Sequence, residues 1–352
     1  MRIDADASAA LLTDLLVAVG SPRPASALVA DVLVRASLVG HDSHGVMRLP
    51  SYVDLVETGR VRPAAEPRVI AEHGCTAVLE GQGGWGPVVA KRAMDMAIAR
   101  GQQTGMAAVA VRGCSHVGRV GEYVEMAARR DMIGLAFVNS YGGGESVVPW
   151  GGRDRRLTPN PVAFAAPGGS APLVLVDVTT SVLPEGKVRW AFQNGAPLPQ
   201  GCIVDSEGRP ATDPGRFYDD PPGALLPLGG VVGHKGTALA VAAELLAGIL
   251  SGAGQSGGGS AEVGNGLLFM AMDIAAFVPL AQFVADVERL RRWVKSSRPA
   301  PGFSEVLFPG EPEEIAYRQR RREGIPVRSE LWQWICAKAE SLRVPNALLP
   351  GD

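Results

Sequence analysis

The chain of 352 residues lacks several features that define common protein classes. It has few cysteines and no Cys-x-x-Cys pair, which fits neither a disulfide framework nor a zinc site. Its formal net charge of -2 leaves no basic excess for a nucleic-acid backbone. Nucleic-acid binding is therefore an unfavoured hypothesis. The four cysteines are Cys75, Cys114, Cys202 and Cys336.

The sequence also lacks a long uninterrupted hydrophobic run. The apolar stretch at residues 238–250 is too short to cross a bilayer and is interrupted by Glu244. Near the N-terminus, Asp4 and Asp6 stand where a secretory signal would need basic residues. We expect a cytoplasmic protein without a membrane segment. Its 46% hydrophobic residues are enough to bury one large domain or two interleaved domains.

Hydrophobic periodicity predicts an α/β (α+β) fold, in which short apolar runs alternate with helical patterns. Helical patterns dominate both chain ends, so we predict a helical domain from residues 1–72 plus 276–352 around an α/β domain at 73–275. The glycine- and serine-rich tract at 251–266 is typical of a mobile surface loop. Predicted strands cover residues 75–80, 106–113, 133–140, 172–180 and 266–273, and predicted helices cover 26–36, 50–59, 87–100, 118–131, 280–294 and 331–342, with a long helix from about 234.

The segment HDSHGVMRLPSY, residues 41–52, joins two predicted helices. One interpretation is structural, with His44 and Arg48 capping and pairing at a helix junction. The other is functional: Ser43, His44 and Arg48 share one site, where a histidine titrating near neutrality exchanges a proton and an arginine binds a carboxylate. His41 and His44 alone make a poor metal site, because a catalytic metal needs about three protein ligands.

Further polar candidates stand at the ends of predicted strands and at the start of a helix. His116 follows an apolar strand, although a structural loop histidine is an equal alternative. Asp177 ends another apolar strand, where a carboxylate needs hydrogen-bond donors such as a histidine. His234 and Lys235 begin a helix whose positive end suits an anion, although a simple helix start is as consistent.

The segment GQGGWG, residues 81–86, formally matches the dinucleotide fingerprint of Rossmann domains. The next predicted strand, however, ends at Arg112 and Gly113 without an acidic residue to bind a ribose hydroxyl. With 44 glycines in the chain, chance matches are expected. We therefore favour a glycine-rich helix entry over a nucleotide site.

Taken together, the motifs resemble the type-2 malate/L-lactate dehydrogenase family, which includes ureidoglycolate and sulfolactate dehydrogenases, diketogulonate reductases and cyclic-imine reductases. The resemblance covers nearly the whole chain. It implies a non-Rossmann NAD(P)-binding domain, a helical domain and a homodimer. The matching segments are HDSHGVMRLPSY, RGCSHVGRVGEY, VVPWGG, TPNPVAFAAP, VDVTTS with GKV, GHKGTALAVAAELLAG, GNGLLFMAMD, and FPGEPEE followed by GIPV.

The resemblance also implies roles for individual residues. His44 matches a histidine associated with proton transfer, with Ser43 and Asp177 in a relay, while some members give the acid/base role to the position of His116. Arg48 is our own candidate for the substrate carboxylate. The implied cofactor contacts are Ser140, Asn160, Asp177, Thr179, Thr180, Ser181, His234, Lys235, Pro309, Gly310 and Glu311, and no metal is implied.

Three departures from the family pattern bear on cofactor and substrate. Thr158-Pro159-Asn160-Pro161 replaces Gly-Thr-Asn-Pro, Glu185 replaces an arginine, and Thr237 stands where tyrosine is common. Glu185 favours NAD over NADP slightly, by repelling the extra phosphate. The sequence thus predicts an NAD(P)-dependent oxidoreductase acting on a small 2-hydroxy or 2-keto acid or a cyclic imino acid. The alternatives are a non-catalytic cofactor-binding relative and, less favoured, a Ser-His-Asp hydrolase.

Overall fold

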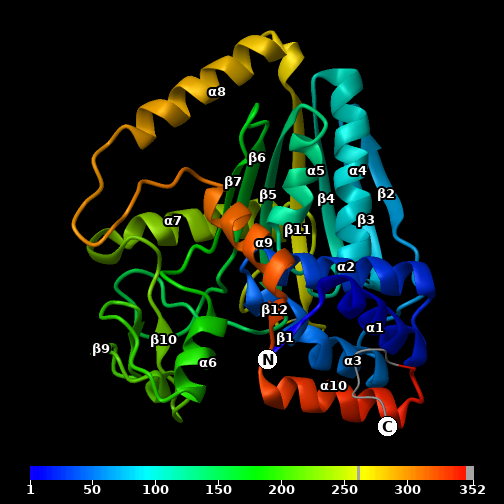
Figure 1. Ribbon diagram of the computed structural model, residues 1–352, viewed down its shortest axis with the longest axis vertical. Coiled ribbons are helices and arrows are strands. Elements are labelled where there is room, and N and C mark those ends of the chain that lie inside the picture. The colour runs from blue at the N-terminus through cyan, green and yellow to red at the C-terminus, as the bar shows by residue number, and fades with distance from the viewer. Residues whose placement is uncertain (260–261, 346–352) are drawn as a thin grey trace.

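The computed structural model describes residues 1–259 and 262–345, and a mixed seven-stranded sheet forms its centre (Figure 1). Only β3 and β4 are parallel neighbours; every other adjacent pair is antiparallel. This order differs from the parallel, doubly wound sheet of Rossmann domains. Across the sheet the strands are β2 (Arg68–His73), β3 (Thr76–Gly84), β4 (Met106–Cys114), β11 (Gly264–Asp273), β5 (Met132–Tyr141), β6 (Val162–Ala166) and β7 (Val174–Val178).

Helices α4 (Gly86–Thr104) and α5 (Gly121–Ala128) cover one face of this sheet (Figure 1). The main core lies between these helices and the sheet, where Val89, Val111 and Phe269 are fully buried. β11 lies at the centre of the sheet, between β4 and β5. Its residues 264–269 are buried without alternation, as expected for a strand segment covered on both sides. The apolar runs of the sequence thus became the innermost strands.

Both chain ends contribute to a second apolar core. β1 (Arg2–Ile3) pairs with β12 (Ile325–Pro326), which ties the two ends together. This packing agrees with a module built from both termini, although the division into two domains stays a prediction and residues 346–352 lie outside the described residues. The helices of this core are α1 (Ala5–Ala18), α2 (Arg23–Leu38), α3 (Leu49–Glu57) and α10 (Ser329–Ser341).

Two elements lie outside the terminal core, although the predicted helical module of 1–72 plus 276–352 contains all or most of each. β2 is an edge strand of the large sheet, although the sequence placed most of it in the helical module. Helix α8 (Leu280–Lys295) extends beyond the end of the sheet (Figure 1) and is held by buried Arg291, which donates to the carbonyls of Gly168 and Pro172. The amphipathic pattern of residues 280–294 predicts a helix, but it does not predict where that helix packs.

A third, smaller core lies below the sheet edge in Figure 1, around Val188, Ile203 and Phe217. Its elements are β8 (Ile203–Val204), β9 (Pro210–Ala211), β10 (Ala224–Leu225), α6 (Glu185–Gln193) and the 3-10 turn η3 (Pro214–Phe217). The remaining elements are the turns η1 (Asp42–His44), η2 (Val46–Arg48), η4 (Gly230–Val232) and η6 (Ile274–Ala276), helices α7 (His234–Ala243) and α9 (Glu311–Glu323), and the π-helix η5 (Glu244–Ile249). No helix in the described ranges is long and apolar enough to cross a membrane.

Two glycine-rich segments have defined conformations. The run at residues 81–84 ends β3, and α4 begins at Gly86, where a Cβ would lie 2.3 Å from the Ser115 carbonyl oxygen. The interpretation as a helix entry is confirmed. The predicted mobile tract at 251–266 is instead anchored, because Ser256 bonds to the buried Glu244 carboxylate and the tract ends inside β11. Residues 260–261 of the tract lie outside the described residues.

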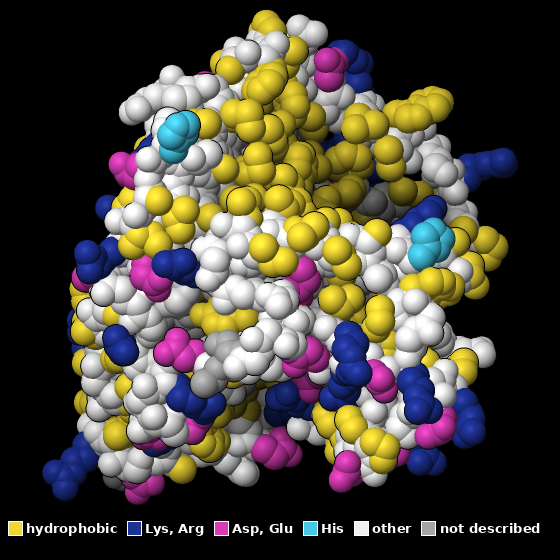
Figure 2. All heavy atoms as spheres, turned by 180° about the vertical axis from the view of Figure 1, so that it is seen from behind, with side chains coloured by type: hydrophobic (Ala, Val, Ile, Leu, Met, Phe, Trp, Pro, Cys, Tyr) yellow, Lys and Arg dark blue, Asp and Glu magenta, His cyan; other side chains and the backbone are white. Residues whose placement is uncertain are grey.

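The sheet face away from α4 and α5 is apolar and incompletely covered. Along β5, Ala136 and Val138 point into the main core, so Ile133, Leu135 and Phe137 point to the other side, where they are only partly buried. Figure 2 shows this side of the molecule as a hollowed surface on which hydrophobic side chains gather. Such a face is unusual for a protein that remains a monomer.

Candidate active site

Two consecutive 3-10 turns, η1 and η2, place the polar residues between α2 and α3. Gly45 connects them and passes so close to α2 that a Cβ would lie 2.0 Å from the Ser37 hydroxyl oxygen. That hydroxyl accepts a hydrogen bond from the Val46 amide at 3.0 Å. On the outer side, His41 bonds to Glu313 of α9 at 3.3 Å. Both ends of the turn are therefore fixed, and His41 is engaged away from a metal role.

Ser43, His44 and Arg48 lie together, as the functional interpretation expects. The Ser43 hydroxyl is 2.9 Å from Nδ1 of His44, and Nε of Arg48 donates to the Ser43 carbonyl at 2.7 Å. The second bond fixes the base of the guanidinium group and leaves its Nη atoms available to a carboxylate. The geometry brings the three side chains into one site, while their chemical roles stay predictions.

His116 belongs to the same site. Its ring stacks on that of His44, with centroids 5.4 Å apart and planes inclined by 16°. Its Nδ1 accepts a hydrogen bond from the Gly118 amide at 3.3 Å and lies 3.0 Å from the hydroxyl of Tyr52. Because an amide can only donate, Nδ1 is unprotonated and the proton of the neutral ring is on Nε2. His116 is thus set to donate a hydrogen bond from Nε2.

Tyr52 is a site residue that the sequence interpretation missed. It stands in the segment 41–52 but was considered only as part of the predicted helix at 50–59. Its ring is fully buried and its hydroxyl also lies 3.1 Å from the His116 carbonyl oxygen. Burial raises the pKa of Tyr52 well above its usual range. A buried tyrosine needs a polar partner, and that requirement is the sequence cue that could have linked it to the site.

The two histidines are neutral in this structure. Burial, followed by the nearby Arg48, lowers the pKa of His44 to about 3. The same two causes, with His44 next, lower the pKa of His116 well below its usual value. The expectation that His44 titrates near neutrality is therefore wrong for the ligand-free protein, because desolvation favours the neutral ring. The same desolvation opposes protonation of His44, so acid–base chemistry there needs a compensating negative charge nearby.

Asp177 does not bond directly to His44 in the described structure. Its Oδ2 accepts the Gly121 amide at 2.8 Å and lies 3.6 Å from Nε of Arg119. Arg119 is itself buried and bonds to Glu125 at 2.8 Å. The relay of Ser43 and Asp177 to His44 stays a prediction, because Asp177 contacts Gly121 and Arg119 in this structure.

Several predicted cofactor residues form one connected cluster. The hydroxyl of Thr158 lies 3.4 Å from the Ser140 amide and donates to the Asn160 side chain. Asn160 in turn donates to the Ala240 carbonyl of α7 at 3.2 Å. Thr158 was seen in sequence only as a hydroxyl displaced by one position. The structure shows that it still joins Ser140 and Asn160, so this departure keeps a hydrogen-bonding hydroxyl at the cluster.

The segment at 179–181 adjoins the same cluster. The Thr180 amide and hydroxyl both donate to the Pro159 carbonyl at 2.8 Å, and the Thr180 carbonyl accepts the Leu228 amide. The hydroxyls of Thr179 and Ser181 are bonded locally. Residues after Leu228 lead through η4 into α7.

The start of α7 offers donors that suit an anion. His234 and Lys235 are both exposed there, and neither side chain forms a hydrogen bond within the described residues. The first amides of a helix also lack intrahelical acceptors. A dinucleotide carries a pyrophosphate, and exposed hydrogen-bond donors at a helix start fit that group. The donor set is therefore compatible with such a cofactor.

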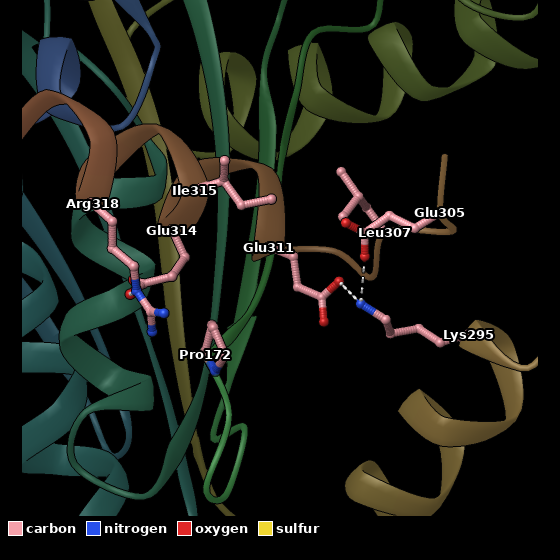
Figure 3. Close-up of a pocket in the computed structure, with 8 residues that line it drawn as sticks. All are labelled: Pro172, Lys295, Glu305, Leu307, Glu311, Glu314, Ile315 and Arg318. Atoms are coloured by element: carbon pink, nitrogen blue, oxygen red, sulfur yellow. Dashed lines mark hydrogen bonds and ion pairs between the residues drawn. The ribbon is translucent and has the colours of Figure 1, made fainter. Parts of the chain in front are cut away.

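The third predicted cofactor segment lies at the start of α9. Gly310 approaches β7 so closely that a Cβ would lie 2.2 Å from the Leu173 carbonyl oxygen. The Glu311 carboxylate binds Lys295 of α8 at 2.5 Å and accepts the Phe308 amide at 2.9 Å. Figure 3 shows Glu311 and Lys295 meeting in a shallow pocket of about 230 Å³. Contact of Pro309, Gly310 and Glu311 with a cofactor stays a prediction.

Glu185, which suggested NAD over NADP, has its charge compensated. Arg189 binds both of its oxygens, with the shortest contact 2.8 Å, and Tyr218 donates to it at 2.8 Å. Helix α6, which carries Glu185, packs beside Ser43. The proposed pyrophosphate donors are on a different helix, α7. Charge repulsion by Glu185 is thus a weak basis for a cofactor preference, and the choice between NAD and NADP stays a prediction.

The stacked histidines, the adjacent arginine and the neighbouring cluster are groups that an oxidoreductase site could use. Comparison with known proteins agrees. The family model for malate/L-lactate dehydrogenase matches residues 3–336, and the chain belongs to this family. It is 37% identical to an L-lactate dehydrogenase of Cupriavidus necator over 98% of this chain and 99% of that protein.

Solved structures show the same similarity. Malate dehydrogenase from Pyrococcus horikoshii superposes with a TM-score of 0.88 and 34% identity, covering 98% of this chain and 97% of that chain. Delta1-piperideine-2-carboxylate reductase from Pseudomonas syringae gives a TM-score of 0.82 and 27% identity, covering 96% of this chain and all of the other (100%). The chain is therefore a dehydrogenase-type oxidoreductase, whose relatives include enzymes named for both hydroxy acids and a cyclic imine.

Proposed function

We propose that this protein transfers a hydride between a nicotinamide cofactor, NAD or NADP, and C2 of a small 2-hydroxy or 2-keto acid. A cyclic imino acid is the second substrate class, suggested by the similarity to the piperideine carboxylate reductase. The observation that supports the reaction best is the neutral His44–His116 pair, stacked at 5.4 Å beside Arg48. Proton transfer at oxygen and binding of a carboxylate are the two tasks that the protein must perform for this reaction.

The roles follow from hydrogen-bond geometry. The 2.9 Å contact between Ser43 and His44 allows the tautomer in which Nδ1 donates to the Ser43 hydroxyl. In that tautomer His44 presents an unprotonated Nε2, which we assign to removing the hydroxyl proton of a 2-hydroxy acid. His116, protonated on Nε2, donates a hydrogen bond to the same substrate oxygen. The Nη atoms of Arg48 hold the carboxylate and so orient C2. In reduction His44 needs a proton, and a bound carboxylate next to Arg48 makes protonation of His44 less unfavourable.

The cofactor provides or accepts the hydride when bound. On the protein side, His234 and Lys235 at the start of α7 are our proposed pyrophosphate ligands. Ser140 and Asn160, joined through Thr158, and the neighbouring segment 179–181 line the proposed cofactor region. The preference for NAD remains a proposal without a charged residue to support it.

A Ser-His-Asp hydrolase has little support. Ser43 and His44 are in hydrogen-bond contact, but Asp177 is bonded to Gly121 and Arg119 instead of orienting His44. A hydrolytic triad needs that third contact to fix the imidazole tautomer. We therefore do not develop this alternative further.

The test is nicotinamide absorbance with the purified full chain. NADH and NADPH are each combined with pyruvate, oxaloacetate, a longer 2-keto acid and a cyclic imino acid, and the oxidised cofactors with the corresponding 2-hydroxy acids. We expect turnover with at least one 2-keto acid. Cofactor binding with no turnover on any of these compounds contradicts the proposal and favours a non-catalytic relative.

We further propose that the protein is a homodimer whose second copy covers the apolar sheet face of Figure 2. Helix α8 borders that region with exposed Leu290 and Trp293, the latter 77% exposed. Burial of a contiguous apolar surface favours association. Sedimentation equilibrium should give twice the chain mass, and Leu135→Asp should shift it toward the monomer. A monomeric wild type at micromolar concentration contradicts the proposal.

A further inference from the structure

The first turn of α6 packs against the proposed catalytic turn. Gly186 lies so near Ser43 that a Cβ on it would be 2.7 Å from the Ser43 Cβ. The residue before it, Glu185, and the residue one turn later, Arg189, therefore lie close to the segment that also holds Arg48 through the Ser43 carbonyl. The start of α6 is thus part of the surroundings of the substrate carboxylate.

Glu185 and Arg189 form a closed ion pair. Nε and Nη2 of Arg189 donate to Oε1 of Glu185 at 3.1 and 2.9 Å, and Nη2 also donates to Oε2 at 2.8 Å. The hydroxyl of Tyr218 adds a fourth bond to Oε1 at 2.8 Å. The glutamate side chain is 24% exposed and the arginine 45% exposed. Arg189 is consequently held at the carboxylate of Glu185 and not free to bind a ligand.

Arg48 differs from Arg189 in having no carboxylate partner within the described chain. Its pKa is lowered, first by burial, and then Arg189 lowers it while Glu185 raises it. The two charges of the pair thus act on Arg48 in opposite directions and partly cancel. Next to Ser43 the site offers one available cation, Arg48, and one cation that is compensated, Arg189.

We propose, on the basis of the proposed function, that Glu185 restricts the substrate to monocarboxylates with an uncharged distal end. One carboxylate binds Arg48. A second anionic group, as in a four-carbon dicarboxylate, finds Arg189 already paired with Glu185 and therefore gains no ion pair that would offset its loss of hydration. The specificity arises from a residue at which this chain departs from the family pattern, since Glu185 stands in place of a cation.

The experiment compares Glu185→Gln with the wild type on pyruvate and oxaloacetate, using whichever nicotinamide cofactor supports turnover. Glutamine keeps the size and the Tyr218 contact but releases Arg189. We expect the ratio of kcat/KM for oxaloacetate to that for pyruvate to rise about tenfold. The double variant Glu185→Gln/Arg189→Met removes the released cation and should return the ratio to about the wild-type value.

A matched control is Glu207→Gln, which breaks an exposed ion pair with Arg153 at 3.2 Å. It should leave the ratio unchanged. Thermal unfolding of each variant shows whether the fold is retained. Glu185→Asp changes the side chain but keeps the negative charge, so it should keep the wild-type substrate preference. An unchanged ratio in a folded Glu185→Gln variant contradicts the inference alone. Absence of wild-type turnover on every 2-keto acid contradicts the inference, and absence of turnover on the cyclic imino acid as well contradicts the proposed function.

Discussion

Replacement of His44 by alanine is the most informative single perturbation of the proposed mechanism. The change removes the imidazole that contacts Ser43 and stacks on His116. General acid–base catalysis contributes roughly a hundredfold to ten-thousandfold to rate, equivalent to about 3 to 5 kcal/mol of activation free energy. His116 cannot replace the missing base readily, because its Nδ1 is occupied by the Gly118 amide and its Nε2 carries the proton. We therefore expect turnover to fall by about a hundredfold or more.

The assay measures kcat for oxidation of the preferred 2-hydroxy acid, with cofactor affinity followed separately by fluorescence titration. Cofactor affinity should change little, because the proposed cofactor cluster is built from other segments. The matched control is His41→Gln, three positions earlier, whose side chain bonds to Glu313 instead of the site. It should retain most of the activity. Turnover of the His44→Ala variant within a few-fold of wild type would falsify the assignment of His44 as the base.

Three further predictions concern substrate binding, acid stability and the cofactor cluster. Arg48→Lys should raise KM for the substrate by about tenfold or more with a smaller effect on kcat, because lysine cannot form the bidentate contact; an unchanged KM in steady-state assays refutes that role. His44 and His116 have folded pKa values below the unfolded value, so they are neutral in the fold but gain protons on unfolding; as pH falls from about 6.5 toward 3, the free energy of unfolding should decrease by up to about 1.4 kcal/mol per pH unit for each. Chemical denaturation of the wild type and of a His44→Gln variant measures this dependence, and equal acid sensitivity of the two disagrees with it. Thr158→Val should destabilise the fold by about 1 to 3 kcal/mol, because Asn160 loses a buried hydrogen-bond partner, and should weaken cofactor binding; urea titration and cofactor fluorescence test it, and a silent substitution in both contradicts the proposed cluster.

The secondary structure was largely predictable because its patterns are local. The apolar runs at residues 106–113, 133–140 and 266–273 all became strands, and the polar segment at 41–52 does join two helices. The order of strands was not predictable. β11 inserts between β4 and β5, although more than a hundred residues separate it from either strand. Phe269, for example, pairs with Val109 on one side and with Ala136 on the other, and such contacts cannot be inferred from local sequence patterns.

Within the site, sequence identified the residue types better than their states. The sequence identified four side chains that do lie together: Ser43, His44, Arg48 and His116. Ser43 and His44 are neighbours in the chain, and His116 follows a strand end, where polar groups gather. The expected titration of His44 near neutrality was wrong, because the pKa of a histidine depends on burial that one sequence does not reveal.

The contacts of Asp177 and Glu185 likewise depend on partners brought from elsewhere. Asp177 was expected beside His44, but Arg119 lies next to it. Glu185 was interpreted as a free negative charge, but its partner is one turn away on the same helix, where an i,i+4 pair could have been anticipated. Thr158 shows the converse: a departure in sequence order preserved the contact in space.

The most direct test of hydride transfer to C2 is isotopic. The purified protein is incubated with a 2-keto acid and reduced nicotinamide cofactor carrying deuterium at C4 on either face, and the product is examined by proton NMR. The account predicts a 2-hydroxy acid with deuterium at C2 from one of the two labelled faces. A product without deuterium at C2 from either face, or no product from any 2-keto acid, contradicts it.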